Sequence, residues 1–104
     1  MADYDVIIRG GTIVDGTRTP RYVSDIAIKD GKISQIGGLS GSTADKVLNA
    51  KDRIVAPGFV DLHTHYDAQI FWDPYCTLSG WHGVTSVALG NCGFGFAPSR
   101  VEDQ

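Results

Sequence analysis

Short runs of alternating apolar and polar positions dominate the first half of the chain. A period of two is typical of β-strands that bury one face. The pattern predicts strands over residues 4–9, 12–14, 23–29, 32–36, 46–49 and 53–56. Gly10-Gly11 separates the first two runs, and Asp30-Gly31 is the strongest hairpin signal in the chain. A flexible loop is expected at 37–45. Residues 1–57 are therefore predicted to form an all-β, sandwich-like domain.

The pattern changes at Pro57-Gly58, where a second domain is predicted to begin and to continue through residue 104. Residues 59–65 follow an apolar run and are predicted to be an extended, buried strand. Val84–Leu89 is rich in β-branched residues and predicts a second buried strand. Between them a short helix is expected at 77–82. Two buried strands joined by a crossover segment predict the start of a parallel α/β unit.

Composition excludes several classes of function. The 104 residues carry a net charge of −3, with Lys and Arg scattered, so nucleic-acid binding is not expected. No apolar stretch approaches the roughly 18 residues of a transmembrane helix, so no membrane association is predicted. The acidic start of the chain lacks the apolar segment of a signal peptide, which favours the cytoplasm. The two cysteines are accordingly expected to be reduced thiols.

The candidate chemistry begins at His63-Thr64-His65. An isolated pair of this kind is most often a solvated or hydrogen-bonded coincidence. Here the pair ends an apolar strand, and buried imidazoles need partners. If residues 59–65 are extended, both imidazoles project to one face together with Asp61. The pattern therefore favours metal binding.

Cys92 lies just past the second predicted strand, in the segment Gly90-Asn91-Cys92-Gly93. The carboxyl ends of parallel strands lie at the same edge of a sheet, so His63, His65 and Cys92 are expected to converge there. Two imidazoles and a thiolate are preferred ligands of Zn²⁺ or a similar divalent ion. Three protein ligands leave positions open, which suits catalysis better than a closed structural site.

Three further residues are candidates for supporting roles or substrate contact. Asp61 shares the face of the histidines but lies one layer deeper, so we expect it to support the ligands rather than bind metal. Asp67 lies close enough to reach the same edge, and Asn91 is placed to orient the cysteine loop. His82 and Cys76 are expected to be structural.

Two segments make the chain similar to a known family. Asp5-Val6-Ile7-Ile8-Arg9-Gly10-Gly11-Thr12-Ile13-Val14-Asp15-Gly16 resembles the opening of the amidohydrolase superfamily, and so does the run from Ile54 to His65. The pairing of the two histidines with Gly90-Asn91-Cys92-Gly93 resembles the D-aminoacylase branch, the N-acyl-D-amino-acid deacylases. The resemblance covers nearly the whole chain.

The resemblance implies a small β-sandwich, assembled from both chain ends, and a (β/α)8 TIM barrel that holds one or two Zn²⁺ ions. It implies that His63, His65 and Cys92 bind metal, the cysteine replacing the carboxylated lysine of other branches. The implied reaction is deacylation of a small N-acyl-D-amino acid by metal-activated water. Since a barrel needs about 250 residues, the chain is expected to be an N-terminal fragment. The catalytic aspartate and two further histidine ligands are expected downstream, in a missing C-terminal part.

Two alternatives stay open at this point. A cyclic-amide hydrolase, similar to hydantoinase or dihydroorotase, fits the first 65 residues equally well, whereas Gly90–Gly93 argues against it. The 104 residues alone could also be a metal-binding fragment without turnover. The sequence leaves the acyl group, the amino acid, the number of metal ions and the oligomeric state undetermined.

Overall fold

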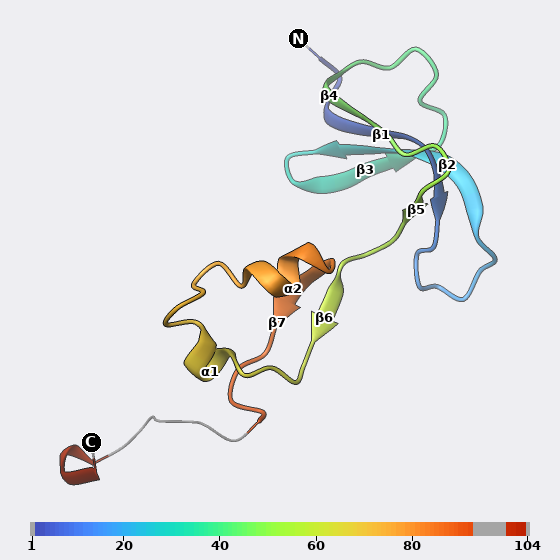
Figure 1. Ribbon diagram of the computed structural model, residues 1–104. Helices are drawn as coiled ribbons and strands as arrows, with labels where there is room; N and C mark the ends of the chain where they lie inside the picture. Colours follow the sequence, from blue (N-terminus) through green and yellow to red (C-terminus); the bar gives the residue numbers. More distant parts are fainter. Residues whose placement is uncertain (1, 93–99, 104) are drawn as a thin grey trace. The chain divides into compact units, whose positions relative to one another are not determined.

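The computed structural model describes residues 2–92 and 100–103, and Figure 1 traces them from the N-terminus in blue to the C-terminus in red. The chain divides into two compact units, Met1–Pro57 and Gly58–Gln104. The helices of the described residues are all too short to span a bilayer.

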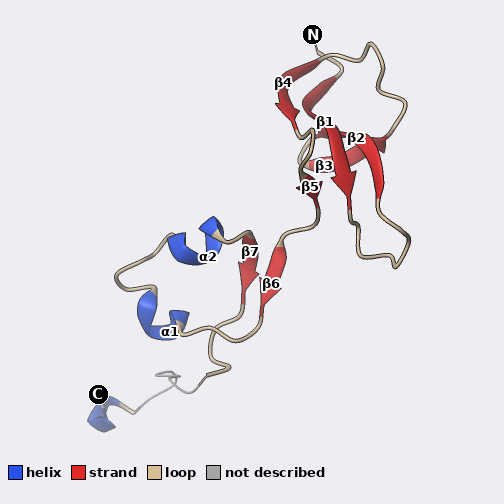
Figure 2. Ribbon diagram, turned by 45° about the vertical axis from the view of Figure 1, so that its right-hand side comes forward, coloured by secondary structure: helices blue, strands red, loops and turns tan. Residues whose placement is uncertain are grey.

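The first unit is a mixed β-sheet, drawn in red in Figure 2. Its strands are β1 (Tyr4–Ile13), β2 (Tyr22–Lys29), β3 (Lys32–Ile36), β4 (Ala44–Asn49) and β5 (Ile54–Val55). The order is β3-β2-β1-β4, and β5 pairs with the end of β1. β1 runs antiparallel to β2 but parallel to β4 and β5. The β-rich character predicted for this part of the chain is confirmed, and the described strands of the unit share one sheet.

Gly10-Gly11 does not end the first strand, so the prediction of two separate strands is wrong. The register between β1 and β2 shifts between Ile8 and Gly11, which marks a β-bulge. Gly10 has a left-handed φ of +67°, a conformation that glycine adopts without steric cost. Its N–H donates to Asp25 Oδ1 over 2.8 Å. The bulge thus accommodates both glycines, and β1 continues through them.

The predicted hairpin at Asp30-Gly31 is confirmed. β2 and β3 pair antiparallel across it, with Lys29 opposite Lys32. Asp30 and Gly31 have φ values of +51° and +71°. Positive φ at both turn residues matches the two-residue turn whose twist fits that of the flanking strands.

The core of the sheet unit extends into the loop that was expected to be flexible. Leu39, in that loop, is 2% exposed and packs with the fully buried Ile7 and Ala27. Arg9 Nη1 donates to the Leu39 carbonyl over 2.9 Å, and Arg9 Nη2 donates to the Ser42 carbonyl over 3.0 Å. The loop is therefore anchored by one apolar side chain and one guanidinium.

Asp25 connects the same guanidinium to the bulge. Its Oδ2 accepts from Arg9 Nη1 over 2.6 Å, and its Oδ1 accepts from the Gly10 N–H. The hydrogen bond from Arg9, and then that from Gly10, holds the pKa of Asp25 below its ordinary value of 3.8. Because the folded state depresses this pKa, the interaction stabilises the fold above the unfolded-state pKa. That contribution is lost as the pH falls through the folded-state pKa.

We expect Asp25→Asn to lower the free energy of unfolding by about 1–2 kcal/mol at neutral pH, because the charge-assisted bonds are partly exposed. The difference from the wild type should shrink as the pH falls from about 5 towards 2. Urea unfolding at a series of pH values measures it. Asp45→Asn, at an exposed position of β4, is the matched control. A difference independent of pH would contradict the assignment.

The second unit contains two short parallel strands joined through two short helices (Figure 1). They are β6 (Phe59–Asp61), α1 (Tyr66–Gln69), α2 (Thr77–Trp81) and β7 (Val84–Val87), followed by the 3-10 helix η1 (Val101–Asp103). Phe59 pairs with Val84, and Asp61 pairs with Val87. The predicted parallel arrangement and the helix near residue 77 are confirmed, whereas α1 was not predicted.

The prediction that both strands are buried is wrong. Every residue of β6 and β7 is exposed or half-buried, and Leu89, at the end of the second predicted strand, is 51% exposed. Phe59, Val60 and Leu62 are 68%, 64% and 63% exposed. Among the described residues, β6 and β7 pair only with each other, so no further strand covers their outer edges. Apolar side chains that a larger sheet would bury are consequently left facing solvent.

Candidate metal centre

The two histidines lie after β6 rather than within it. β6 ends at Asp61, so the expectation of one extended strand through residue 65 is wrong. His65 is the N-cap residue of α1, with φ −108° and ψ 25°. The ring centroids of His63 and His65 are nevertheless 6.2 Å apart, with 33° between the ring planes. The imidazoles lie together because the loop holds them, not because they alternate along a strand.

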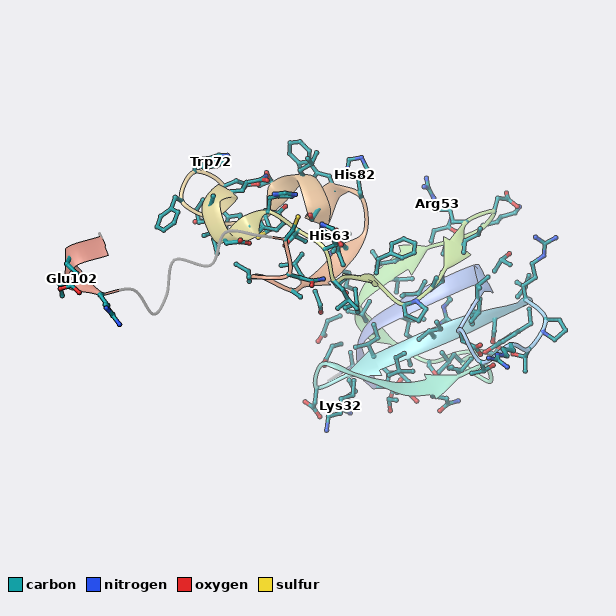
Figure 3. The ribbon with its side chains drawn as sticks, turned by 90° about the horizontal axis from the view of Figure 1, so that it is seen from below. Lys32, Arg53, His63, Trp72, His82 and Glu102 are labelled. Atoms are coloured by element: carbon teal, nitrogen blue, oxygen red, sulfur yellow. The ribbon has the colours of Figure 1, made fainter. Side chains whose placement is uncertain are left out.

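Cys92 completes a group of three candidate ligands. One ligand atom from each of His63, His65 and Cys92 lies within 4.8 Å of the other two. Both histidines are exposed and Cys92 is half-buried. Figure 3 labels His63 on the segment that follows β6. The structure thus brings together three side chains from two loops, one after each parallel strand.

The donor set fits a tetrahedral zinc site. Bond lengths of about 2.0–2.1 Å to nitrogen and 2.3 Å to sulfur place tetrahedral ligand atoms roughly 3.3–3.6 Å apart. The widest separation here, at most 4.8 Å, is larger by roughly 1 Å. Two imidazole nitrogens and one cysteine sulfur also match the ligand preference of a borderline divalent ion.

Asp61 and Asn91 support the ligand loops through backbone hydrogen bonds. Asp61 Oδ1 accepts from the His63 N–H over 3.1 Å, and the Asp61 carbonyl accepts from the Ala88 N–H over 2.9 Å. Asn91 Nδ2 donates to the Leu62 carbonyl over 2.6 Å. Both residues therefore contact the loops without belonging to the group of three ligands.

Asp67 lies in the first turn of α1 and faces the cysteine side of the site. Its Oδ1 accepts a long hydrogen bond of 3.4 Å from the Gly90 N–H. Its Oδ2 is buried and has no hydrogen-bond partner among the described residues. Gly90 itself has a φ of +81°, so the chain turns sharply just before Cys92. Gly93, the last residue of the motif, lies outside the described residues.

Thr64 is the site residue that sequence reasoning missed. It is 5% exposed, and its Oγ1 donates to the Ala88 carbonyl over 2.6 Å. The hydroxyl thus bonds across to the loop that carries Cys92. Nothing in the residue pattern marks this contact, because a threonine between two histidines is equally compatible with an exposed position.

The remaining histidine and cysteine of the described residues do not belong to the group of three ligands. His82 Nδ1 lies 2.8 Å from the Leu78 carbonyl at the end of α2. Cys76 precedes α2 with a left-handed φ of +48°. Cys76 and Cys92 are both half-buried and are not joined by a disulfide.

The chain matches a known protein family and is similar to several known proteins. The model of the amidohydrolase family matches residues 46–103. N-acyl-D-glutamate deacylase of Alcaligenes xylosoxydans xylosoxydans is 43% identical over 97 residues, which are 93% of this chain and 20% of the relative. The chain thus spans about a fifth of the length of such relatives.

Solved structures agree with these sequence matches. N-acyl-D-glutamate deacylase from Bordetella bronchiseptica, complexed with zinc and a phosphonate inhibitor, superposes with a TM-score of 0.85 at 39% identity. The match covers 95% of this chain and 21% of that structure. A crystal structure of D-aminoacylase gives a TM-score of 0.81 at 38% identity, covering 91% of this chain and 20% of that structure.

The sequence of D-hydantoinase of Ralstonia pickettii is 46% identical over 89 residues, which are 86% of this chain and 18% of that relative, but a solved hydantoinase structure matches a shorter part of the chain. The structure of D-hydantoinase is 48% identical, but it covers 59% of this chain and 13% of that structure, with a TM-score of 0.52. The deacylase structures therefore account for much more of the chain than the hydantoinase structure does.

Proposed function

This chain belongs to the amidohydrolase family, and from that premise we propose that the complete protein is a metal-dependent hydrolase of N-acyl-D-amino acids. Relatives that match almost the whole chain include N-acyl-D-glutamate deacylase and D-aminoacylase. Because this chain spans about a fifth of their length, activity is proposed for the complete protein. The 104 residues contribute part of the metal site and are expected to have no turnover alone.

The observation that carries the proposal is the convergence of His63, His65 and Cys92, whose ligand atoms lie within 4.8 Å of one another. The Bordetella relative is complexed with zinc, which supports Zn²⁺ as the ion for this site. A divalent metal held there would supply an activated water nucleophile and a Lewis acid for the amide carbonyl. The three residues would hold that metal and leave room for further ligands.

Other residues of this chain hold the segments that carry the ligands. Asp61 and Asn91 hold the backbone of the histidine segment through the hydrogen bonds described above. Proton transfer to the leaving amine needs a carboxylate or another acid near the reacting bond. We propose that this acid is an aspartate outside the 104 residues. Two further histidine ligands of the metal are also proposed to lie outside them.

The proposed architecture of the complete protein is a (β/α)8 barrel with a small β-sandwich. Parallel β6 and β7, joined through helices, are what the first two barrel strands would look like, and the candidate ligands follow the carboxyl end of each strand. The mixed sheet of residues 1–57 would form one layer of the sandwich. The exposed apolar side chains of β6 would be covered by later strands.

A cyclic-amide hydrolase is the competing enzyme. An identity of 46% to D-hydantoinase over 86% of the chain favours it, although the solved hydantoinase structure covers 59% of the chain, compared with 95% for the deacylase. The cysteine in Gly90-Asn91-Cys92 replaces the carboxylated lysine expected of that alternative. We therefore favour the linear amide as substrate.

The test is hydrolysis by the complete protein of N-acyl-D-glutamate and other N-acyl-D-amino acids, with their L enantiomers and hydantoin as controls. We expect release of the free D-amino acid, loss of activity after dialysis against a chelator, and recovery with Zn²⁺. Metal content measured before and after dialysis should follow the activity. Hydrolysis of hydantoin without hydrolysis of any N-acyl amino acid would contradict the proposal.

A further inference from the structure

The two loops that carry the candidate ligands are tied together by residues outside the ligand group. The histidine loop comprises residues 62–65, and the cysteine loop comprises residues 88–92. Thr64 Oγ1 of the first loop donates to the Ala88 carbonyl of the second over 2.6 Å. Asn91 Nδ2 of the second loop donates to the Leu62 carbonyl of the first over 2.6 Å. The two hydrogen bonds, called the loop ties below, are reciprocal, since each loop supplies one side-chain donor and one backbone acceptor.

Each tie adjoins a ligand. Thr64 lies between His63 and His65, and it is 5% exposed while both histidines are exposed. Its inward hydroxyl therefore keeps the two flanking imidazoles on the outer side of the loop. Asn91 directly precedes Cys92, so its bond to the Leu62 carbonyl sets the position of the thiol relative to the histidine loop.

We infer that Thr64 and Asn91 are positioning residues that hold the Cys92 thiol at binding distance from the two imidazoles before a metal arrives. The inference rests on the proposed function. Ordering ligands from two separate loops costs conformational entropy at the moment of binding, and ties that already exist remove much of that cost. Residues that orient ligands in this way commonly change metal affinity by about 10–100-fold.

The alternative is that these bonds only stabilise the fold. Coupling to Cys92 separates the two possibilities. If Thr64 acts by holding the cysteine loop against the histidine loop, Thr64→Val should lower metal affinity much less in a Cys92→Ala background than in the wild type. If Thr64 only stabilises the fold, its effect should be the same in both backgrounds, because additive effects indicate independent roles.

The experiment is a Co²⁺ titration of the complete protein, followed through the thiolate-to-cobalt charge-transfer band where Cys92 is present and by isothermal titration calorimetry where Cys92 is alanine. We expect Thr64→Val and Asn91→Ala each to weaken Co²⁺ binding by about 10–100-fold and to lower the band intensity at saturation. Thr64→Ser keeps the hydroxyl and should restore both. Thr85→Val is the matched control, since Thr85 lies on β7 at an exposed position with no side-chain hydrogen bond to the described residues.

The outcomes separate this inference from the proposed function. A wild-type protein without any thiolate band would overturn the ligand set, and with it both proposals. A normal band with full Co²⁺ affinity in Thr64→Val and Asn91→Ala would overturn the inference alone. So would an equal loss of affinity in the presence and absence of Cys92. Asn91 is exposed, so its variant tests the inference even where Thr64→Val does not fold.

Discussion

Cys92→Ala is expected to lower the metal affinity of the complete protein by more than about a hundredfold. Loss of a residue that only orients a ligand commonly costs about 10–100-fold, so loss of a ligand should exceed that range. Cys92 is the one sulfur donor in the group and the one ligand from its loop. Its removal leaves two imidazoles from a single loop as the ligands of the described residues, so the loop after β7 no longer contributes a ligand. Deacylase activity should fall by a similar factor.

Metal content after dialysis and the rate of N-acyl-D-amino-acid hydrolysis measure this effect. Cys76→Ala is the matched control, because Cys76 is also a half-buried free thiol but lies outside the ligand group. It should keep both metal and activity. Full metal content and unchanged turnover in Cys92→Ala would refute the assignment of Cys92 as a ligand.

Gly58→Ala is expected to have the second largest effect. A Cβ at Gly58 would overlap Thr85 Oγ1 and Cγ2 and would lie 2.7 Å from Thr85 Cβ. Gly58 immediately precedes β6 and Thr85 lies on β7, so the substitution pushes the paired strands apart. Overpacking of this kind costs about 1–3 kcal/mol, and we expect the upper part of that range because the nearest atoms lie close to the backbone. Metal affinity should fall as well, since both ligand loops follow these strands.

Gly80→Ala supplies the control for Gly58→Ala. Gly80 lies within α2 and has open space around the position of a Cβ. The same chemical change there should be neutral or stabilising, by up to about 1 kcal/mol. Urea unfolding and metal titration of both variants make the comparison. Equal stability of the two variants would show that the contact between Gly58 and Thr85 does not limit the approach of β6 and β7.

Features of the fold that depend on a strong local residue pattern, such as the hairpin, could be predicted from the sequence. Asp30-Gly31 marks a hairpin because few residue pairs accept positive φ at both positions. Gly10-Gly11 is also typical of a turn, but β1 continues through both glycines. That outcome depends on Asp25, fifteen residues away, which accepts from the Gly10 N–H and so supports a bulge within β1. A tertiary partner of this kind is invisible to a local pattern.

The candidate site was predicted in part, and partly for the wrong reason. The order of the two predicted strands indicated that they are parallel neighbours, so their following loops were expected to lie close together. The structure does bring the ligand atoms of His63, His65 and Cys92 together. The expected mechanism, alternation along an extended strand, fails because β6 ends at Asp61. Instead, the buried Thr64 hydroxyl holds the histidine loop by donating to the Ala88 carbonyl. The sequence does not indicate which carbonyl group a threonine side chain will bond.

The parallel pairing of β6 and β7 has a consequence for the order of folding events. Parallel strands cannot be closed by a tight turn, so the chain between Asp61 and Val84 must loop back before any pairing forms. Such non-local closure is slow compared with hairpin formation. The three candidate ligands therefore become neighbours only after this step. A bound ion should then slow the unfolding of this unit far more than it speeds its folding.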